Sequence, residues 1–273
     1  MDASLMHLQE KTFDTGEMVL NYAKGPAHGS PVVLLHGLTD WWHGWEHLIP
    51  YLTDTWHVYA PDLRGHGKSG RGSGVRFNIE DYVRDIASFL RGVVKEPAVL
   101  VGHSLGAVTA LYTGAAAPEQ VRGLVLCDPP LSAFHETIDP ENGAGWWFSL
   151  VTEAARAKTP AEQEAFLQAK LPQTPAEGIK ELARELAYVD PGAPQAALDN
   201  TLFAIDHLPE TLRQLSCPVV FLQGEKSLGG QMWDEDAGLV HEVLPAAEVI
   251  RFPDVGHGTH MQVEAILAQL RRM

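Results

Sequence analysis

The stretch AVLVGHSLGAVTALYTGAA, residues 98–116, decides the fold. It opens on an apolar run that is typical of a buried strand, and it closes on an alanine-rich run that favours a helix. Between them stand Gly102, Ser104 and Gly106 in a GxSxG pattern, whose glycines let a strand reverse tightly into a helix. The pattern therefore predicts a strand, a sharp turn and a helix. The Ser104 side chain should stand out at the turn, with the N–H of Leu105 at the positive end of the helix dipole.

Short apolar runs of the same kind recur on both sides of this stretch. They occupy residues 31–35, 57–60, 121–127, 219–222 and 248–252, and segments with helical spacing separate most of them. The clearest helix is predicted to begin after Asn78, which is a favourable N-cap residue. Strands that alternate with helices and are almost continuously apolar predict an α/β fold, with a mostly parallel sheet covered by helices on both faces.

The alternation of strands and helices stops between residues 131 and 208. Only short helical patterns occur there, at residues 153–157, 161–170, 179–188 and 195–205, separated by prolines. We therefore predict a helical cap over residues 131–208, inserted into a core made of residues 1–130 and 209–273. Trp146 and Trp147 near its start are too apolar for a solvated loop, so they either pack the cap onto the sheet or line a pocket beneath it.

Charge and composition narrow the range of partners. The chain has 273 residues, with 20 Lys and Arg against 35 Asp and Glu, and a net charge of -15. Nucleic acids and anionic membrane surfaces bind basic faces, so we expect neither as a partner. No apolar run is long enough for a membrane-spanning helix, and residues 1–10 lack the pattern of a signal peptide, so we expect a cytoplasmic protein. The sequence leaves open whether it is a monomer or a homodimer.

Four pieces of the sequence together resemble the α/β hydrolase family. They are His36 with Gly37 after the strand at 31–35, the run DLRGHGKS at residues 62–69, the turn around Ser104, and Gly256 with His257 near the end. The resemblance implies an eight-stranded, mostly parallel sheet flanked by helices, with an inserted helical cap. Within the family, Ser104 disfavours the branches that use an aspartate nucleophile, the epoxide hydrolases and haloalkane dehalogenases.

The resemblance also implies roles for particular residues. Ser104 would be the nucleophile, and His257 would be the base that activates it and later returns the proton. The backbone N–H groups of Leu38 and Leu105 would bind the negative oxygen of a tetrahedral intermediate. His103, beside the nucleophile, is interpreted as a residue that packs behind the turn.

The acid that should orient His257 is where the sequence departs from the common family pattern. After the strand at 219–222 the family usually shows Gly, two residues and Asp, but here the fourth position is Ser227. A neutral serine cannot stabilise an imidazolium by charge. Asp128 is the first candidate, because some family members place the acid after the preceding strand. The alternatives that stay open are Glu225, Asp234 and Asp236.

Two other motifs suggest cofactors, and their context argues against both. His43, Glu46 and His47 fit the HxxEH pattern of a zinc site, but the sequence signals no third ligand. The GxGxxG at residues 65–70 continues as a loop where a dinucleotide site needs a helix to begin. We therefore predict neither a metal nor an organic cofactor.

The residues together predict a serine hydrolase that cleaves small carboxylic esters through an acyl-enzyme intermediate. Trp41 and Trp42, which follow the oxyanion loop, join Trp146 and Trp147 as candidate pocket residues for an apolar substrate, with core packing as the alternative. Cleavage of a C–C bond, a lactone or an amide on the same scaffold is the second hypothesis. The third is a non-catalytic ligand-binding protein, because Ser227 stands where an acid is expected.

Overall fold

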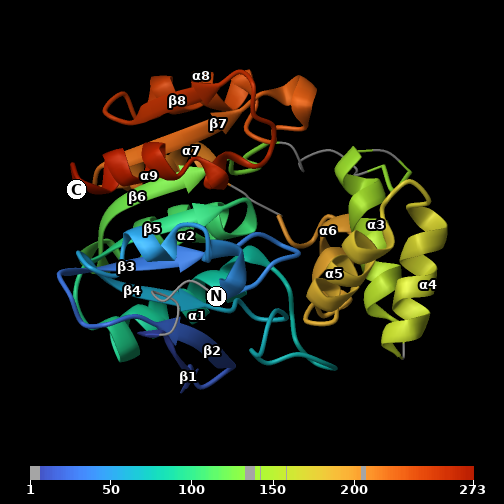
Figure 1. The fold of residues 1–273 in the computed structure, drawn as a ribbon. Coiled ribbons are helices and arrows are strands. Elements are labelled where there is room, and N and C mark those ends of the chain that lie inside the picture. The colour runs from blue at the N-terminus through green and yellow to red at the C-terminus, as the bar shows by residue number, and fades with distance from the viewer. Residues whose placement is uncertain (1–6, 133–138, 142, 158, 204–206) are drawn as a thin grey trace.

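A computed structural model describes residues 7–132, 139–141, 143–157, 159–203 and 207–273. Its centre is an eight-stranded sheet with the order β1-β2-β4-β3-β5-β6-β7-β8 (Figure 1). The strands are β1 (Gln9–Asp14), β2 (Val19–Lys24), β3 (Ser30–Leu35), β4 (Trp56–Pro61), β5 (Ala98–His103), β6 (Val121–Cys127), β7 (Val219–Gly224) and β8 (Glu248–Phe252). Only the pairings of β2 with β1 and β4 are antiparallel, which confirms the predicted mostly parallel α/β fold.

The strand registers bring the functional segments to one edge of the sheet. Leu35 pairs with Gly102, His103 pairs with Cys127, and Gly224 pairs with Phe252. Each of these residues lies at or next to the carboxyl end of its strand, and these strands run parallel. The loops that follow β3, β5, β6, β7 and β8 therefore leave the sheet at the same edge.

Helices cover both faces of the sheet. Five of them flank it: α1 (Ile79–Phe89), α2 (Leu105–Ala116), α7 (Leu208–Gln214), α8 (Asp234–Val243) and α9 (Val263–Leu270). Shorter helical turns are Trp42–Trp45, Ile49–Tyr51, Leu90–Val94, Pro118–Gln120, Lys226–Leu228 and Thr259–Met261. As predicted, Asn78 caps α1, because its side chain accepts the N–H of Asp81.

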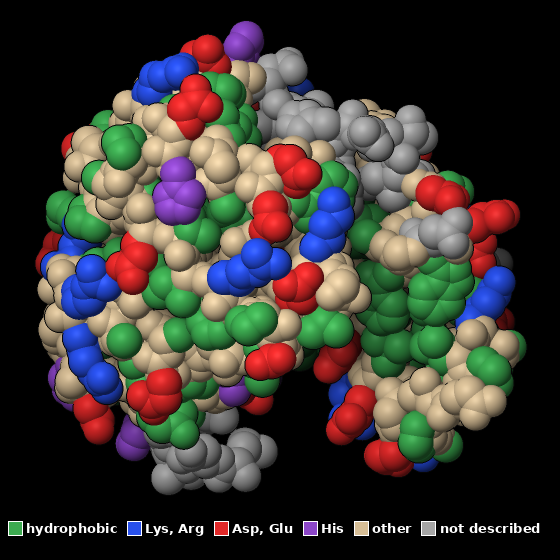
Figure 2. All heavy atoms as spheres, turned by 90° about the horizontal axis from the view of Figure 1, so that it is seen from above, with side chains coloured by type: hydrophobic (Ala, Val, Ile, Leu, Met, Phe, Trp, Pro, Cys, Tyr) green, Lys and Arg blue, Asp and Glu red, His purple; other side chains and the backbone are tan. Residues whose placement is uncertain are grey.

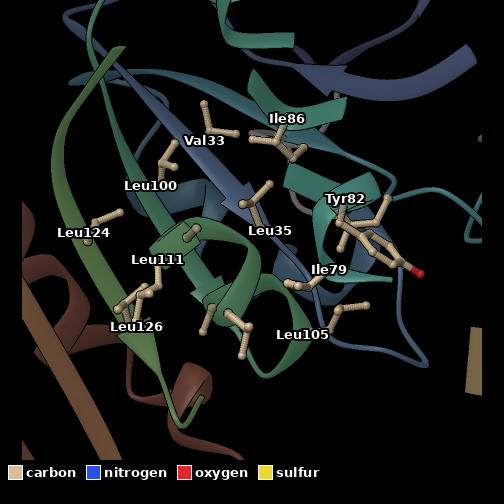
Figure 3. Close-up of a cluster of buried hydrophobic side chains, with 14 of the residues drawn as sticks. Val33, Leu35, Ile79, Tyr82, Ile86, Leu100, Leu105, Leu111, Leu124 and Leu126 are labelled. Carbon is tan, nitrogen blue, oxygen red and sulfur yellow. The ribbon is translucent and has the colours of Figure 1, made fainter. Parts of the chain in front are cut away.

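Two hydrophobic clusters fill the space between these layers. Alternate strand residues such as Val33, Leu35 and Leu100 meet Ile86 of α1 and Leu111 of α2 on one face (Figure 3). The residues between them in sequence face the other side, where α9 and the turn Trp42–Trp45 pack. Near-continuous apolar strands are thus buried on both faces, which holds the strand ends rigidly for the site.

Four further helices lie to one side of the sheet, between β6 and α7 along the chain (Figure 1). They are α3 (Gly143–Ala155), α4 (Pro160–Lys170), α5 (Ala176–Leu186) and α6 (Gly192–Leu198), and we call them the inserted helices. Three of them, α3, α4 and α5, share a hydrophobic cluster that includes Leu150, Leu167 and Ile179. The helix α6 instead packs into the sheet cluster through Ala193, Ala196 and Ala197. The inserted helices therefore have an apolar centre of their own, and α6 and Phe148 of α3 join them to the sheet cluster.

The bounds of two inserted helices differ from the sequence prediction. α3 begins about ten residues before the predicted 153–157, and its first turn holds glycines that mask a helical pattern. α6 ends at Leu198, short of the predicted 195–205, because Asn200 adopts a left-handed backbone conformation with φ of 55°. The last two residues of that predicted helix, 204 and 205, lie outside the described residues.

Candidate active site

Ser104 lies in a strained turn between β5 and α2. Its φ of 52° and ψ of -117° are unusual for a residue other than glycine. A Cβ on Gly102 would lie 2.4 Å from the carbonyl oxygen of Gly106, and a Cβ on Gly106 would lie 2.1 Å from the carbonyl oxygen of Leu35. Only glycines fit these two positions, so the chain turns sharply and presents Ser104 at the start of α2.

Asp128 follows β6 directly and is completely buried. Its Oδ2 lies 2.6 Å from Nδ1 of His257 and accepts the N–H of Gln231 at 2.7 Å. Its Oδ1 accepts the N–H groups of Gly224 at 2.9 Å and Met232 at 3.2 Å. The carboxylate is thus held by three backbone donors, one at the end of β7 and two in the loop that follows, and its Oδ2 also contacts His257.

The other three candidate acids lie elsewhere. Glu225 accepts from Ser227 and from Arg251 on the surface. Asp234 accepts from Gln223 and pairs with Arg251. Asp236 accepts the N–H of Trp233 at the start of α8. Among the four acids left open by the sequence, the structure brings only Asp128 to His257.

His257 stands in the loop after β8, and its backbone is tied to the serine turn. The ring of His103, the residue before Ser104, lies 4.7 Å from the ring of His257. Nε2 of His103 donates to the carbonyl oxygen of His257 at 2.9 Å. Since Nδ1 of His257 is held by Asp128, its Nε2 is the nitrogen available to Ser104 or a ligand, and both residues line the same cavity.

The rings of His103 and His260 stack beside Ser104 and His257. The sequence predicts that His103 packs behind the turn but does not identify His260. Their ring centroids are 3.8 Å apart, and both rings line the cavity. Burial holds the pKa of His103 well below its ordinary value. Burial, together with the charge of His47, also lowers the pKa of His260 to about 4. Both rings are therefore neutral at neutral pH. His260 stands three residues after His257, and no motif in the sequence singles it out.

The loop after β3 carries Leu38 into the same cavity. A Cβ on Gly37 would lie 2.9 Å from Nδ1 of His103 and 3.5 Å from Cβ of Ser104, so this loop passes in contact with the serine turn. The buried His66 holds the loop, because its Nε2 contacts the carbonyl oxygen of Leu38. The structure thus places Leu38 beside the first turn of α2, where Leu105 begins the helix.

The four candidate pocket tryptophans separate into different environments. Trp147 alone among them lines the cavity. Trp41 stacks on Tyr188 at 4.5 Å, and Trp146 is 38% exposed. Trp42 is buried in the sheet core, where its backbone N–H donates to Asp62, so its assignment to the pocket is corrected to core packing.

The cavity at this edge has a volume of about 770 Å³ and lies between the sheet and the inserted helices. Figure 2 shows the hollow between the inserted helices and the rest of the molecule, with hydrophobic side chains on its wall. Leu38, Ala144, Trp147, Phe148 and Met261 supply apolar wall, while Asp40 and Glu185 supply carboxyl groups. A cavity of this size and mixed lining suits a small organic molecule.

The HxxEH residues do not converge on one point. Nδ1 of His43 contacts Glu46 at 2.6 Å, whereas Nε2 of His47 donates to the carbonyl oxygen of His260 at 3.0 Å. Within the described ranges, no group of three potential metal ligands is found. No helix in the described part of the chain is both long and apolar enough to cross a membrane.

Comparison with known proteins identifies a matching family and related hydrolases. Residues 30–262 match the family model described as alpha/beta hydrolase fold. Over 233 residues the chain is 30% identical to 2-(acetamidomethylene)succinate hydrolase from Mesorhizobium japonicum, spanning 83% of this chain and 81% of that protein. It is also 31% identical over 232 residues to a haloalkane dehalogenase from Bradyrhizobium diazoefficiens, spanning 83% of this chain and 69% of that one.

A solved structure agrees with the sequence matches. The crystal structure of E-2-(acetamidomethylene)succinate hydrolase has a TM-score of 0.73 to this chain at 25% identity, covering 96% of this chain and 98% of that one. The family model, the relatives matched over most of their length and the shared architecture agree with one another. On these grounds the chain belongs to the alpha/beta hydrolase fold family.

Proposed function

We propose that the protein is a serine hydrolase of small carboxylic esters that works through an acyl-enzyme. The contact of 2.6 Å between Nδ1 of His257 and the buried Asp128, at the cavity that Ser104 also lines, carries this proposal. A carboxylate on Nδ1 fixes the tautomer in which Nε2 is free to accept a proton. Serine hydroxyls are poor nucleophiles at neutral pH, so this base is what the chemistry requires.

In the proposed reaction, Nε2 of His257 removes the proton of Ser104 as its oxygen attacks the ester carbonyl. The N–H groups of Leu38 and Leu105 stabilise the negative oxygen of the tetrahedral intermediate, by typically about 3 kcal/mol per donor. The imidazolium, stabilised by Asp128, then protonates the leaving alcohol. Water activated by His257 attacks the acyl-enzyme and releases the acid. The inserted helices would act as the cap that closes this reaction off from solvent.

An amide hydrolase is the second candidate, because the relative from Mesorhizobium japonicum is named for an acetamido compound. That compound is also a succinate, and two carboxylates call for basic partners. Lys and Arg are absent from the described residues that line this cavity, so the pocket does not favour a dicarboxylate. An amide without carboxylates would use the same serine, base and oxyanion donors.

Labelling with a fluorophosphonate probe and a burst assay with 4-nitrophenyl butyrate test the proposal. We expect one label per chain, a burst of nitrophenol, and loss of both in Ser104→Ala. Ester turnover that survives in Ser104→Ala would reject the mechanism. An unlabelled protein that releases no nitrophenol would instead favour the non-catalytic ligand-binding alternative.

A further inference from the structure

Two carboxyl groups from separate parts of the chain line the same cavity. Asp40 stands in the loop that follows Leu38, and Glu185 stands in the last turn of α5 in the inserted helices. Their charges interact across the cavity. The carboxyl of Asp40 accepts the N–H of Trp41, and neither Asp40 nor Glu185 forms an ion pair within the described part of the chain.

The wall of the cavity offers these two carboxyl groups no cation. Lys and Arg are absent from its described lining, and the third carboxylate, Glu46, is already bound to His43. Burial, together with the charge of Glu185, raises the pKa of Asp40 to about 7. Burial and the charge of Glu181 raise the pKa of Glu185 as well. Asp40 is partly buried, whereas Glu185 stays exposed to solvent. A carboxylate that is partly shielded from water without a cationic partner is costly, so a cationic ligand beside these two groups would be stabilising.

A second observation in this cavity concerns the Ser104 hydroxyl. The Ser104 side chain is about nine-tenths buried, lines the cavity, and forms no hydrogen bond through its hydroxyl within the described residues. Between Ser104 and the carboxyl groups the wall is largely apolar, with Leu38, Trp147 and Phe148 among its residues. The cavity therefore offers a reacting end, an apolar middle and an acidic end.

We propose that Asp40 and Glu185 bind a protonated amine of the substrate. The substrate would be a carboxylic ester whose ammonium group is separated from the scissile carbonyl by a short apolar segment. This inference rests on the proposed function, because it assigns a substrate class to the same serine site. The ammonium donates hydrogen bonds to both carboxylates, one from the sheet body and one from α5, and so selects cationic substrates over anionic ones.

Two sets of matched esters test this charge selection. On the alcohol side, the butyrates of 2-(dimethylamino)ethanol, 3-methylbutanol and 3-hydroxypropanoate share one shape but are cationic, neutral and anionic. The acyl-side set consists of the methyl ester of 4-(dimethylamino)butanoic acid, the methyl ester of 5-methylhexanoic acid and the monomethyl ester of glutaric acid. These three also share one shape and are cationic, neutral and anionic. Acid release in a pH-stat near neutral pH gives kcat/KM for each. In at least one set we expect the amine to exceed its neutral isostere by about tenfold, and the anion to fall below it.

Variants assign this preference to the two carboxyl groups. Asp40→Asn and Glu185→Gln should each bring the ratio of kcat/KM for amine over neutral ester toward one. Glu177→Gln, in the first turn of the same helix and outside the lining, is the matched control and should keep the wild-type ratio. Equal rates for all three charges in both sets, or a ratio unchanged in Asp40→Asn and Glu185→Gln, would overturn the inference and leave the serine mechanism standing.

A binding measurement separates this inference from catalysis. Calorimetric titration of the Ser104→Ala variant with the amine esters and their neutral isosteres measures affinity without turnover. We expect the amine to bind more tightly by about tenfold in the set that shows the kinetic preference, and the advantage to disappear in Ser104→Ala combined with Glu185→Gln. Failure of fluorophosphonate labelling would count against the proposed function, whereas equal affinities would count against the amine site.

Discussion

Replacing Asp128 with Asn removes one charge while keeping the shape of the side chain. Asn tolerates the left-handed backbone at this position, where φ is 48°. The carboxylate receives four contacts, with Gly224 and Met232 on Oδ1 and Gln231 and His257 on Oδ2. An amide has one oxygen, so in either orientation its NH₂ group faces donors that the carboxylate had satisfied.

The size of the effect follows from which contacts the amide keeps. If its oxygen stays with Gly224 and Met232, its NH₂ group faces Nδ1 of His257 and forces the tautomer in which Nε2 carries the proton. That tautomer cannot accept the proton of Ser104, and in a serine protease the equivalent change lowers kcat by about 10⁴-fold. The unsatisfied N–H of Gln231 should in addition lower the free energy of unfolding by about 1–3 kcal/mol.

The assay is kcat for 4-nitrophenyl butyrate, with urea unfolding measured on the same preparations. Glu225→Gln is the control, because Glu225 occupies the loop where the family usually has its acid but contacts Arg251 at the surface. We expect Asp128→Asn to lose at least about 10³-fold in kcat and Glu225→Gln to stay within about twofold. The reasoning is refuted if Asp128→Asn stays within tenfold of the wild type, or if Glu225→Gln shows the larger loss.

Three further substitutions test other parts of the structure. Gly106→Ala should lower the free energy of unfolding by about 3 kcal/mol or more, because the new Cβ would lie 2.1 Å from the carbonyl oxygen of Leu35. Urea unfolding measures this, and an unchanged unfolding midpoint would contradict the close approach. Burial lowers the pKa of His260 to about 4, so the unfolded chain takes up the proton first as the pH falls below about 6.5, and stability is lost on acidification. His260→Gln should therefore remove about 2 kcal/mol of the stability difference between about pH 6.5 and pH 5, and curves of equal slope for both proteins would refute this. Trp147→Ala should raise KM for apolar esters by several-fold, whereas the partly exposed Trp146→Ala should not, and equal effects would contradict the placement of these two rings.

The sequence predicts best those features that depend on neighbouring residues. Gly102 and Gly106 stand in the GxSxG pattern that marks a tight turn from strand to helix, and the apolar runs indicate strands buried on both faces. The sheet and the serine turn can therefore be predicted directly from the sequence. The side-chain cap of α1 by Asn78 is another local feature, and it was predicted correctly. The preference for Asp128 came from the family resemblance, while local sequence left three other acids open.

Features that depend on distant contacts could not be predicted in the same way. Trp42 stands next to Trp41 in sequence, but the backbone directs one ring into the sheet core and the other onto Tyr188. The zinc-like spacing of His43 and His47 gives no sign that His47 reaches His260, more than 200 residues later. Asp40 and Glu185 line one cavity because the end of α5 lies near the loop after β3, and no pattern along the chain marks that arrangement.

The separate apolar centre of the inserted helices has a consequence for how this protein can change. Residues there, such as Leu150 and Ile179, pack on one another and make no part of the clusters that hold the sheet. Exchanges at exposed cavity residues such as Glu185 of α5 can thus reshape one half of the cavity without disturbing the strand ends that carry the reacting groups, whereas Phe148 of α3 is packed into the sheet cluster. Substrate preference can drift over generations while the bond-breaking machinery is inherited unaltered.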